Sequence, residues 1–220
     1  MTIGRLSHES PAYAKVRDEL QAAEIALRDQ RERVAELRRT LPHDTAVDDA
    51  VLVEVRDGVQ QGVRLSELFR VPGRPLILMH FMFGKAQQHP CPMCTSWADG
   101  YDGILPHLAQ RADFVLFVAG DPGVFGEYAR RRGWRNVRIV SAGDSTLKRD
   151  LGFETEEGGQ HPGLSVFERD ADGSIRHFYS QSATLGEAGF RGMDLLNPLW
   201  HFLDALPEGR GDFMPRKQYD

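Results

Sequence analysis

The chain has 220 residues, and its 27 Lys and Arg against 32 Asp and Glu give a formal net charge of -5 at pH 7. This length suffices to bury a hydrophobic core and favours one domain with an appendage over two full domains. Positive and negative side chains are interspersed, which excludes the cationic face that nucleic-acid phosphates or anionic lipids require. We therefore expect neither nucleic acid nor a membrane as a partner.

The sequence also predicts the compartment. The N-terminal residues contain no apolar segment of the kind found in signal peptides, and the longest apolar run, Pro75–Phe83, is too short to span a bilayer. The chain has two cysteines, separated by two residues, whereas a secreted disulfide framework uses more of them at longer spacings. We expect a cytoplasmic protein whose cysteine pair serves redox chemistry or metal binding.

A long amphipathic helix is the first predicted element. Ser10-Pro11 is typical of a helix start, because Ser accepts hydrogen bonds from the first turn and Pro is tolerated at the first helical position. Apolar side chains then follow a 4-3-4-3 spacing in which Gln30 is the polar exception. They are Val16, Leu20, Ala23, Leu27, Val34, Leu37 and Leu41. This stripe fits a helix lying on its own domain, and it also fits an arm through which two copies form a homodimer.

Strands and helices alternate after the break at Pro42. A nearly continuous apolar run over 74–83 predicts a central strand covered on both faces by helices. Before it we expect a lead-in hairpin, with a strand over 51–55, a turn at Asp57-Gly58 and a helical turn over 64–69. After it we expect a helix over 91–111, a strand over 113–119, a helix over 122–132 closed by Gly133 and a strand over 137–140.

The last third of the chain predicts a hairpin and a closing helix. Two apolar segments, 164–169 and 174–179, flank an Asp-Gly turn and predict an antiparallel edge on the parallel sheet. A helix over 192–206 would then cover the sheet, and the Gly-, Pro- and charge-rich tail would be frayed. The expected organisation is an N-terminal helical extension over 1–45, an α/β domain with a central mixed sheet flanked by helices over 46–206, and a disordered tail over 207–220.

The two cysteines form a C-x-x-C pair, Cys91-Pro92-Met93-Cys94, between the buried strand and the next helix. At a helix start, unpaired N–H groups and the helix dipole favour a thiolate at Cys91, and Pro92 fits an early helical position. A second thiol one turn later can resolve a mixed disulfide. We therefore assign Cys91 as the attacking thiol and Cys94 as the buried resolving thiol.

Five stretches carry a family resemblance: 80–84 (HFMFG), 91–94 (CPMC), 97–103 (WADGYDG), 162–167 (PGLSVF) and 192–194 (GMD). In these stretches the chain resembles the thioredoxin-like superfamily and, more closely, its bacterial DUF899 branch, from about Leu20 to Leu206. The resemblance implies a thioredoxin-like fold and a redox site. It implies no substrate, because that branch has no settled activity.

The same resemblance implies a cis-proline facing the C-x-x-C, and Pro162 has the matching position. With a cis bond, the backbone of His161 would pair with a substrate beside Cys91. The alternative is an ordinary trans proline before a strand. We assign His161, Pro162 and Trp97 to substrate binding. Met93 stands where thioredoxins carry proline, and the Thr-x-x-Cys of typical peroxiredoxins is missing, which disfavours a peroxidase.

Three residues are assigned to support the cysteines: His89 to tune the Cys91 thiolate, Pro92 to open the helix, and Asp99 as a proton acceptor for Cys94. Asp99 equally fits a helix-end contact before Gly103. His80 is interpreted as a core histidine, and His107 as a surface residue.

These assignments favour a thiol-disulfide oxidoreductase that acts on a thiol or disulfide, in a protein or a small molecule, without cofactor or metal. One alternative is a copper carrier that uses both thiolates with His89 or His161. Another is an interaction module that senses redox state and dimerises through its first helix.

Overall fold

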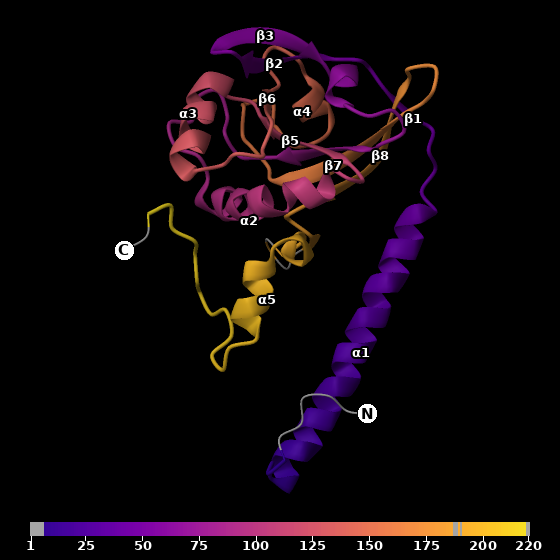
Figure 1. Ribbon diagram of the computed structural model, residues 1–220, viewed down its shortest axis with the longest axis vertical. Helices are drawn as coiled ribbons and strands as arrows, with labels where there is room; N and C mark the ends of the chain where they lie inside the picture. The colour runs from indigo at the N-terminus through magenta and orange to yellow at the C-terminus, as the bar shows by residue number, and fades with distance from the viewer. Residues whose placement is uncertain (1–6, 187–188, 190, 219–220) are drawn as a thin grey trace. The chain divides into compact units, whose positions relative to one another are not determined.

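The computed structural model describes residues 7–186, 189 and 191–218, and the contacts divide the chain into residues 1–42 and residues 43–220. The first unit contains α1 (Pro11–Arg39), the indigo helix of Figure 1. Ser10 caps it by accepting the N–H of Tyr13, and Pro11 occupies the first turn, as predicted. None of the residues of α1 is buried, and Leu27 is 57% exposed. The apolar stripe is therefore uncovered within this first unit.

The second unit is built on a sheet of eight strands, all within the described residues, in the order β1-β8-β7-β4-β5-β6-β2-β3 (Figure 1). The strands are β1 (Thr45–Val47), β2 (Val51–Arg56), β3 (Val59–Arg64), β4 (Leu76–His80), β5 (Asp113–Val118), β6 (Ile139–Ser141), β7 (Gly163–Arg169) and β8 (Ile175–Ser182). The helical segments of this unit are η1 (Leu65–Leu68), α2 (Pro92–Leu108), α3 (Pro122–Arg132), α4 (Leu147–Asp150), η3 (Asp194–Leu196) and α5 (Pro198–Asp204).

The centre of the sheet confirms the predicted fold class. β4 pairs in parallel with β5, and α2 connects these two strands. On its other side β4 pairs antiparallel with β7, which pairs antiparallel with β8. A β-α-β unit followed by a hairpin in the order β8-β7-β4-β5 is the thioredoxin-like arrangement. The end of β4, from which the chain enters the C-x-x-C loop, thus lies beside the start of β7, where His80 pairs with Gly163.

Two apolar layers cover the sheet, and they follow from the alternation of side chains along each strand. Leu76, Leu78 and Phe117 face the layer that includes Leu147 of α4. Met79 and Phe81 belong to the other layer, with side chains of α2 and α3. Figure 1 shows α2 and α4 on opposite sides of the sheet. The two layers place α2, and with it the cysteines, against one face only.

The predicted lead-in hairpin is part of the sheet. The turn between β2 and β3 falls at Asp57 and Gly58, whose φ angles of 51° and 80° both lie in the left-handed region that suits a tight hairpin. β2 also pairs with β6, at Val53 and Ser141. The hairpin therefore extends the sheet beyond its thioredoxin-like centre, which the sequence analysis did not predict.

The single closing helix predicted over 192–206 is wrong. The segment forms the short 3-10 turn η3 and then α5, a helix of seven residues. Pro198 explains the interruption, because proline has no N–H for a continuing helix and instead opens a new one. Asn197 caps this new helix by accepting the N–H of Leu199. Trp200 is buried, whereas Phe202 is 73% exposed.

None of the helices in the described part of the chain combines the length and the apolar character needed to cross a membrane.

Candidate functional site

Cys91 lies at the start of α2, where the loop that follows β4 meets the helix. It is the N-cap residue, with extended backbone angles, and Pro92 follows as the first helical residue. The Cys91 N–H donates to the carbonyl of Met82 at 3.4 Å, which ties the helix start to the end of β4. Cys94 follows one turn later. It is 1% exposed, whereas Cys91 is half-buried, and both are free thiols.

The two thiols influence each other in opposite directions. A hydrogen bond from the Cys94 thiol, the backbone N–H groups of Cys94 and Met93, and the charge of Lys217 together lower the pKa of Cys91 to about 6, although burial opposes them. The Cys94 N–H lies 3.5 Å from the Cys91 sulfur. The hydrogen bond that the Cys94 thiol donates to the Cys91 sulfur, together with burial, raises the pKa of Cys94 well above its ordinary value. The pair therefore holds its negative charge on the more exposed sulfur.

A lysine that the sequence analysis did not identify lies behind the pair. Lys148 of α4 is fully buried, and its Nζ donates to the carbonyls of Phe81 and Phe117, at 3.1 Å each. Burial lowers the pKa of Lys148 to about 7, while the negative charge that Cys94 carries once it is deprotonated and the charge of Glu154 act against that shift. The amine thus bridges the ends of β4 and β5 and acts electrostatically on the buried thiol.

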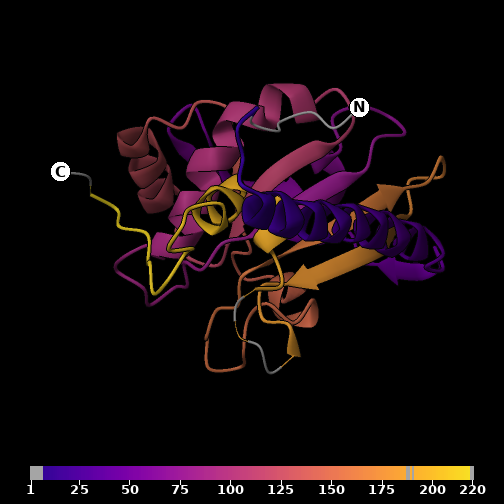
Figure 2. The same ribbon diagram turned by 90° about the horizontal axis from the view of Figure 1, so that it is seen from below.

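The cation that acts on Cys91 comes from the C-terminal segment. Lys217 Nζ donates to the carbonyl of Pro90 at 3.1 Å, and the Lys217 carbonyl accepts from Arg132 of α3 at 2.6 Å. Pro215 is buried. Figures 1 and 2 show this yellow segment running from α5 to the side of the domain that carries α2 and α3. The sequence analysis predicts a disordered tail here and no contact with Cys91. It assigns the tuning of the Cys91 thiolate to His89, which is exposed.

Asp99 connects α2 with α3. Its carboxylate accepts from Nε of Arg132 at 3.2 Å and from the indole N–H of Trp134 at 2.7 Å. These bonds link Asp99 to α3 rather than to Cys94. The alternative role of Asp99, a helix-end contact before Gly103, is also wrong, because α2 continues past Gly103 to Leu108, within the predicted range of 91–111. Asp102, one turn after Asp99, accepts the N–H groups that follow α3, including that of Asn136 at 2.7 Å.

The three residues assigned to substrate binding lie in different surroundings. Trp97 is 2% exposed and packs in the α2-side layer, so its ring is core and not a substrate surface. The described residues contain no cis peptide bond, so the predicted cis conformation of Pro162 is wrong. Its carbonyl accepts the N–H of Ala183, which fits the alternative of a trans proline leading into a strand. His161 is exposed, and its N–H donates to Phe153.

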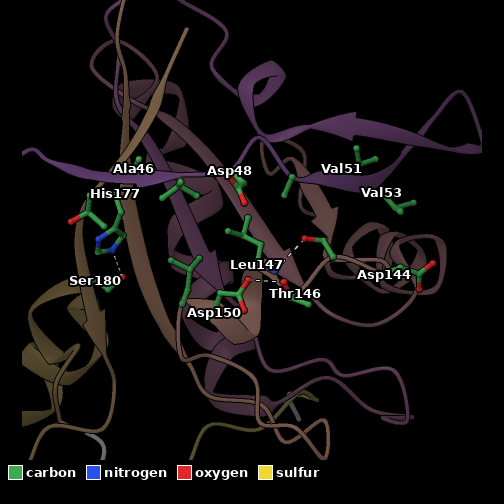
Figure 3. A pocket seen from close by; sticks show the side chains of 15 residues that line it. Ala46, Asp48, Val51, Val53, Asp144, Thr146, Leu147, Asp150, His177 and Ser180 are labelled. Carbon is green, nitrogen blue, oxygen red and sulfur yellow. Dashed lines mark hydrogen bonds between the residues drawn. The ribbon is translucent and has the colours of Figure 1, made fainter.

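A cavity of about 970 Å³ lies away from both cysteines, neither of which lines it. Figure 3 shows it between β1, β2, α4 and β8, with Asp48, Asp150 and His177 among the side chains that line it. A smaller cavity of about 400 Å³ lies beside Pro90, the residue before Cys91. Of these two cavities, only the smaller is lined by a residue adjacent to the C-x-x-C pair.

Comparison with known proteins assigns the family. A family model described as a bacterial protein of unknown function, DUF899, matches residues 5–219. The chain belongs to the DUF899 family. No curated protein matches this DUF899 chain.

Solved structures resemble the DUF899 protein at low identity. A mutant of peroxiredoxin Q from Xanthomonas campestris is 18% identical, with a TM-score of 0.47 over 74% of this chain and 95% of its own. A mutant of PrxQ from Xylella fastidiosa is 13% identical, with a TM-score of 0.48 over 74% of this chain and 97% of its own. Reduced Prx3 of Vibrio vulnificus in complex with hydrogen peroxide is 14% identical, with a TM-score of 0.43 over 63% of this chain and 88% of its own.

A buried histidine of the DUF899 protein begins a chain of hydrogen bonds. His80 is fully buried and stacks on Phe153 with ring centroids 3.7 Å apart. Its Nε2 lies 2.9 Å from the hydroxyl of Ser165, which lies 2.7 Å from that of Ser180, which in turn lies 2.7 Å from Nε2 of His177. The last of these bonds is drawn in Figure 3, at the wall of the large cavity.

The side chains of the DUF899 protein also bear on metal binding. Across residues 7–186, 189 and 191–218, no three His, Cys, Asp or Glu side chains gather as a metal site would require. His89 and His161 therefore do not join the two thiols in the copper site considered above.

Proposed function

We propose that the protein is a thiol-disulfide oxidoreductase in which Cys91 attacks and Cys94 resolves. The observation that carries this proposal is the placement of two free thiols at one helix start: half-buried Cys91 caps α2, and buried Cys94 follows one turn later. In these positions the pKa of Cys91 falls to about 6, and that of Cys94 rises. A thiolate at neutral pH is the form that attacks disulfides, and the protonated partner holds its proton until the first step is complete.

The reaction balances as two exchanges. The Cys91 thiolate attacks one sulfur of a disulfide, forms a mixed disulfide and expels the first thiolate. Cys94 then loses its proton and attacks the Cys91 sulfur, which forms the intramolecular disulfide and expels the second thiolate. The substrate gains two electrons and the protein loses two, which an external dithiol restores in a further exchange. In both exchanges on the substrate, the attacking sulfur belongs to Cys91 or Cys94.

Lys148 would assist the second step. The negative charge that Cys94 acquires on deprotonation is buried, and burial without a partner charge is unfavourable. The positive charge of Lys148 acts on Cys94 in the direction that lowers its pKa. We therefore assign Lys148 a positioning role, in which its charge stabilises the Cys94 thiolate. We also propose that the cycle runs in the cytoplasm, a reducing compartment.

The test is a trapping experiment with 5,5′-dithiobis(2-nitrobenzoate). The reduced wild type should release two thionitrobenzoate equivalents, and Cys94→Ser should release one and keep the other as a stable mixed disulfide. Cys91→Ser should release none on the same timescale, and serine preserves the helix cap. Trapping by Cys91→Ser instead of Cys94→Ser would reverse the roles, and no release by the wild type would refute the activity.

We further propose that two copies associate through α1. The stripe that contains Leu27 and Val34 is exposed along a helix without buried residues, and its spacing suits a coiled coil. Leu27→Glu with Val34→Glu should yield monomers in analytical ultracentrifugation, with thiol release unchanged. Ala22→Glu with Ala35→Glu, off the stripe, should leave the dimer intact. A monomeric wild type contradicts the proposal.

A further inference from the structure

The small cavity beside Cys91 has a cationic rim in a chain of net negative charge. Its lining combines three basic side chains, a histidine, two amides and an apolar floor, and contains no carboxylate. These residues are Arg131, Arg132, Lys217, His89, Gln88, Gln218, Phe83, Pro90, Val124 and Tyr128. Its volume of about 400 Å³ lies in the range of small-ligand sites.

Contacts behind the rim hold two of its charges in place. Arg132 binds Asp99 on one side and the Lys217 carbonyl on the other, so its charge is largely compensated and it fixes the C-terminal segment. Lys217 has no carboxylate within ion-pair distance among the described residues. Within the described part of the chain, the ion-pair partner of Arg131 is Glu127, whose carboxylate lies 3.9 Å from Arg131 Nη1, and both side chains are exposed. Lys217 and Arg131 are therefore the cations best able to meet an anionic ligand.

The cavity floor is connected to the helix start that carries Cys91. The Tyr128 hydroxyl lies 2.8 Å from the Thr95 hydroxyl, and Thr95 donates to the Cys91 carbonyl at 2.9 Å. Lys217 reaches the same place from the other side, through the carbonyl of Pro90. A small molecule bound in the cavity would therefore lie against Pro90, the residue before Cys91, while its charged groups meet the rim.

We infer that this cavity binds the carboxylate groups of a small anionic disulfide that Cys91 then reduces. The inference rests on the proposed exchange activity and adds the substrate class to it. The chemistry is charge recognition: carboxylates of the ligand pair with Lys217 and Arg131, while its carbon chain lies on Tyr128 and Phe83. The exchange step is the one described above, with the two thiolates of the ligand as products.

The test compares three disulfides that differ in charge. Oxidised glutathione carries carboxylates, 2-hydroxyethyl disulfide is neutral and cystamine is cationic. We measure kcat/KM for each with dithiothreitol as electron donor and divide by the rate of its uncatalysed reaction with dithiothreitol. The wild type should prefer the anionic disulfide, and 0.5 M NaCl should reduce that preference. Equal normalised values for the three overturn the inference.

Single substitutions locate the effect. Lys217→Met and Arg131→Met should each lower the ratio of anionic to neutral kcat/KM about fivefold, the size of one exposed ion pair. The ratio cancels any change in the thiolate fraction of Cys91. Arg130→Met and Arg216→Met are the controls. Arg130 and Arg216 are the sequence neighbours of Arg131 and Lys217 but lie outside the lining of this cavity, so these substitutions should leave the ratio unchanged. An equal loss in the controls would show a general surface effect and overturn the site.

A binding measurement separates this inference from the proposed activity. S-methylglutathione has the carboxylates of glutathione but neither a disulfide nor a free thiol, so its binding does not depend on exchange. Calorimetric titration should show binding to the wild type, and weaker binding to Lys217→Met and Arg131→Met. Binding with no disulfide reduction would refute the activity alone. Reduction with no binding, and with no preference for charge, would refute the anionic site alone.

Discussion

The start of α2 and the interior one turn later place two identical thiols in opposite surroundings. Around Cys91, free N–H groups and the nearby Lys217 stabilise negative charge, and the sulfur remains half-buried. Around Cys94, apolar side chains exclude water, and the buried cation that acts on it, Lys148, comes from α4 on the opposite side of the sheet. The comparison teaches that three residues of helix suffice to shift the pKa values of two thiols in opposite directions, because helix-end effects act only within the first turn.

The largest expected effect concerns the reactivity of Cys91. With a pKa of about 6 against an ordinary 9.0, Cys91 should be ~90% thiolate at pH 7, compared with ~1% for an ordinary cysteine. Its alkylation by iodoacetamide should rise with pH, reach half of its maximum near pH 6 and level off above pH 7. Peptide mass spectrometry after brief labelling identifies the modified cysteine.

A variant sharpens the same measurement. The largest cause of the low pKa of Cys91 is the hydrogen bond from the Cys94 thiol. Cys94→Ala removes that donor, so the midpoint for Cys91 should move upward, toward the value of an ordinary thiol. An alkylation midpoint near pH 9 for Cys91 in the wild type, or faster labelling of Cys94 than of Cys91, would contradict the opposite pKa shifts of the two thiols.

Lys148→Met should give the next largest effect, with opposite signs for stability and activity. Burial lowers the pKa of Lys148 from 10.5 to about 7, so the folded state binds this proton less tightly than the unfolded state does. The resulting loss of stability begins as pH falls below 10.5 and is complete below about 7. Methionine should therefore raise the free energy of unfolding by about 1–3 kcal/mol at pH 6, and by little near pH 10.5.

The stability gain requires that the carbonyls remain satisfied, and they do. The Phe81 carbonyl also accepts the N–H of Phe83, and that of Phe117 accepts the N–H of Phe81. Urea unfolding at the two pH values measures the gain. Stopped-flow decay of the mixed disulfide should show that resolution by Cys94 slows about tenfold, since the nearby positive charge is lost. Unchanged resolution would leave Lys148 without a part in the reaction.

Lys217→Met should produce the smallest effect. Its charge is the weakest of the influences that lower the pKa of Cys91, and the side chain is partly exposed. The alkylation midpoint of Cys91 should rise by about half a pH unit or less, and 0.5 M NaCl should raise the wild-type midpoint by a similar amount. If neither salt nor the substitution changes the alkylation midpoint of Cys91, the charge of Lys217 does not influence the pKa of this thiol.

Local signals in the sequence predict the start of α2 and all of α3. Cys91-Pro92 after an apolar strand identifies the helix start, and Gly133 ends α3 with a φ of 79°. The charged groups around the thiols carry no such signal. Lys148 contacts Phe81 across 67 residues, and Lys217 contacts Pro90 across 127. Both sit in ordinary polar stretches, so only the folded chain reveals them.

Other errors have a different origin. The interpretation of residues 192–206 as one helix follows apolar spacing and overlooks Pro198, which divides the segment. The cis-proline assignment follows the superfamily resemblance, whereas Pro162 is trans in this chain. Spacing and resemblance both describe an average protein, and single residues decide where one chain departs from it.

The chain of hydrogen bonds from His80 to His177 fixes where two imidazoles carry their protons. Its three bonds need three protons, and the hydroxyls of Ser165 and Ser180 supply two, so one histidine donates through Nε2. Nδ1 of His80 is buried without a partner among the described residues. Buried N–H groups are orphaned less often than acceptors.

His80 therefore carries its proton on Nε2 and donates toward Ser165, and the bonds run outward to Nε2 of His177, which accepts. The two rings are neutral in opposite tautomers, in keeping with the lowered pKa of each, caused mainly by burial. When His177 takes up a proton at the cavity wall, its Nε2 turns from acceptor to donor, and every hydroxyl in the chain must reverse. A titration at the surface is thus registered at the centre of the sheet as a shift of one proton between the nitrogens of a buried ring.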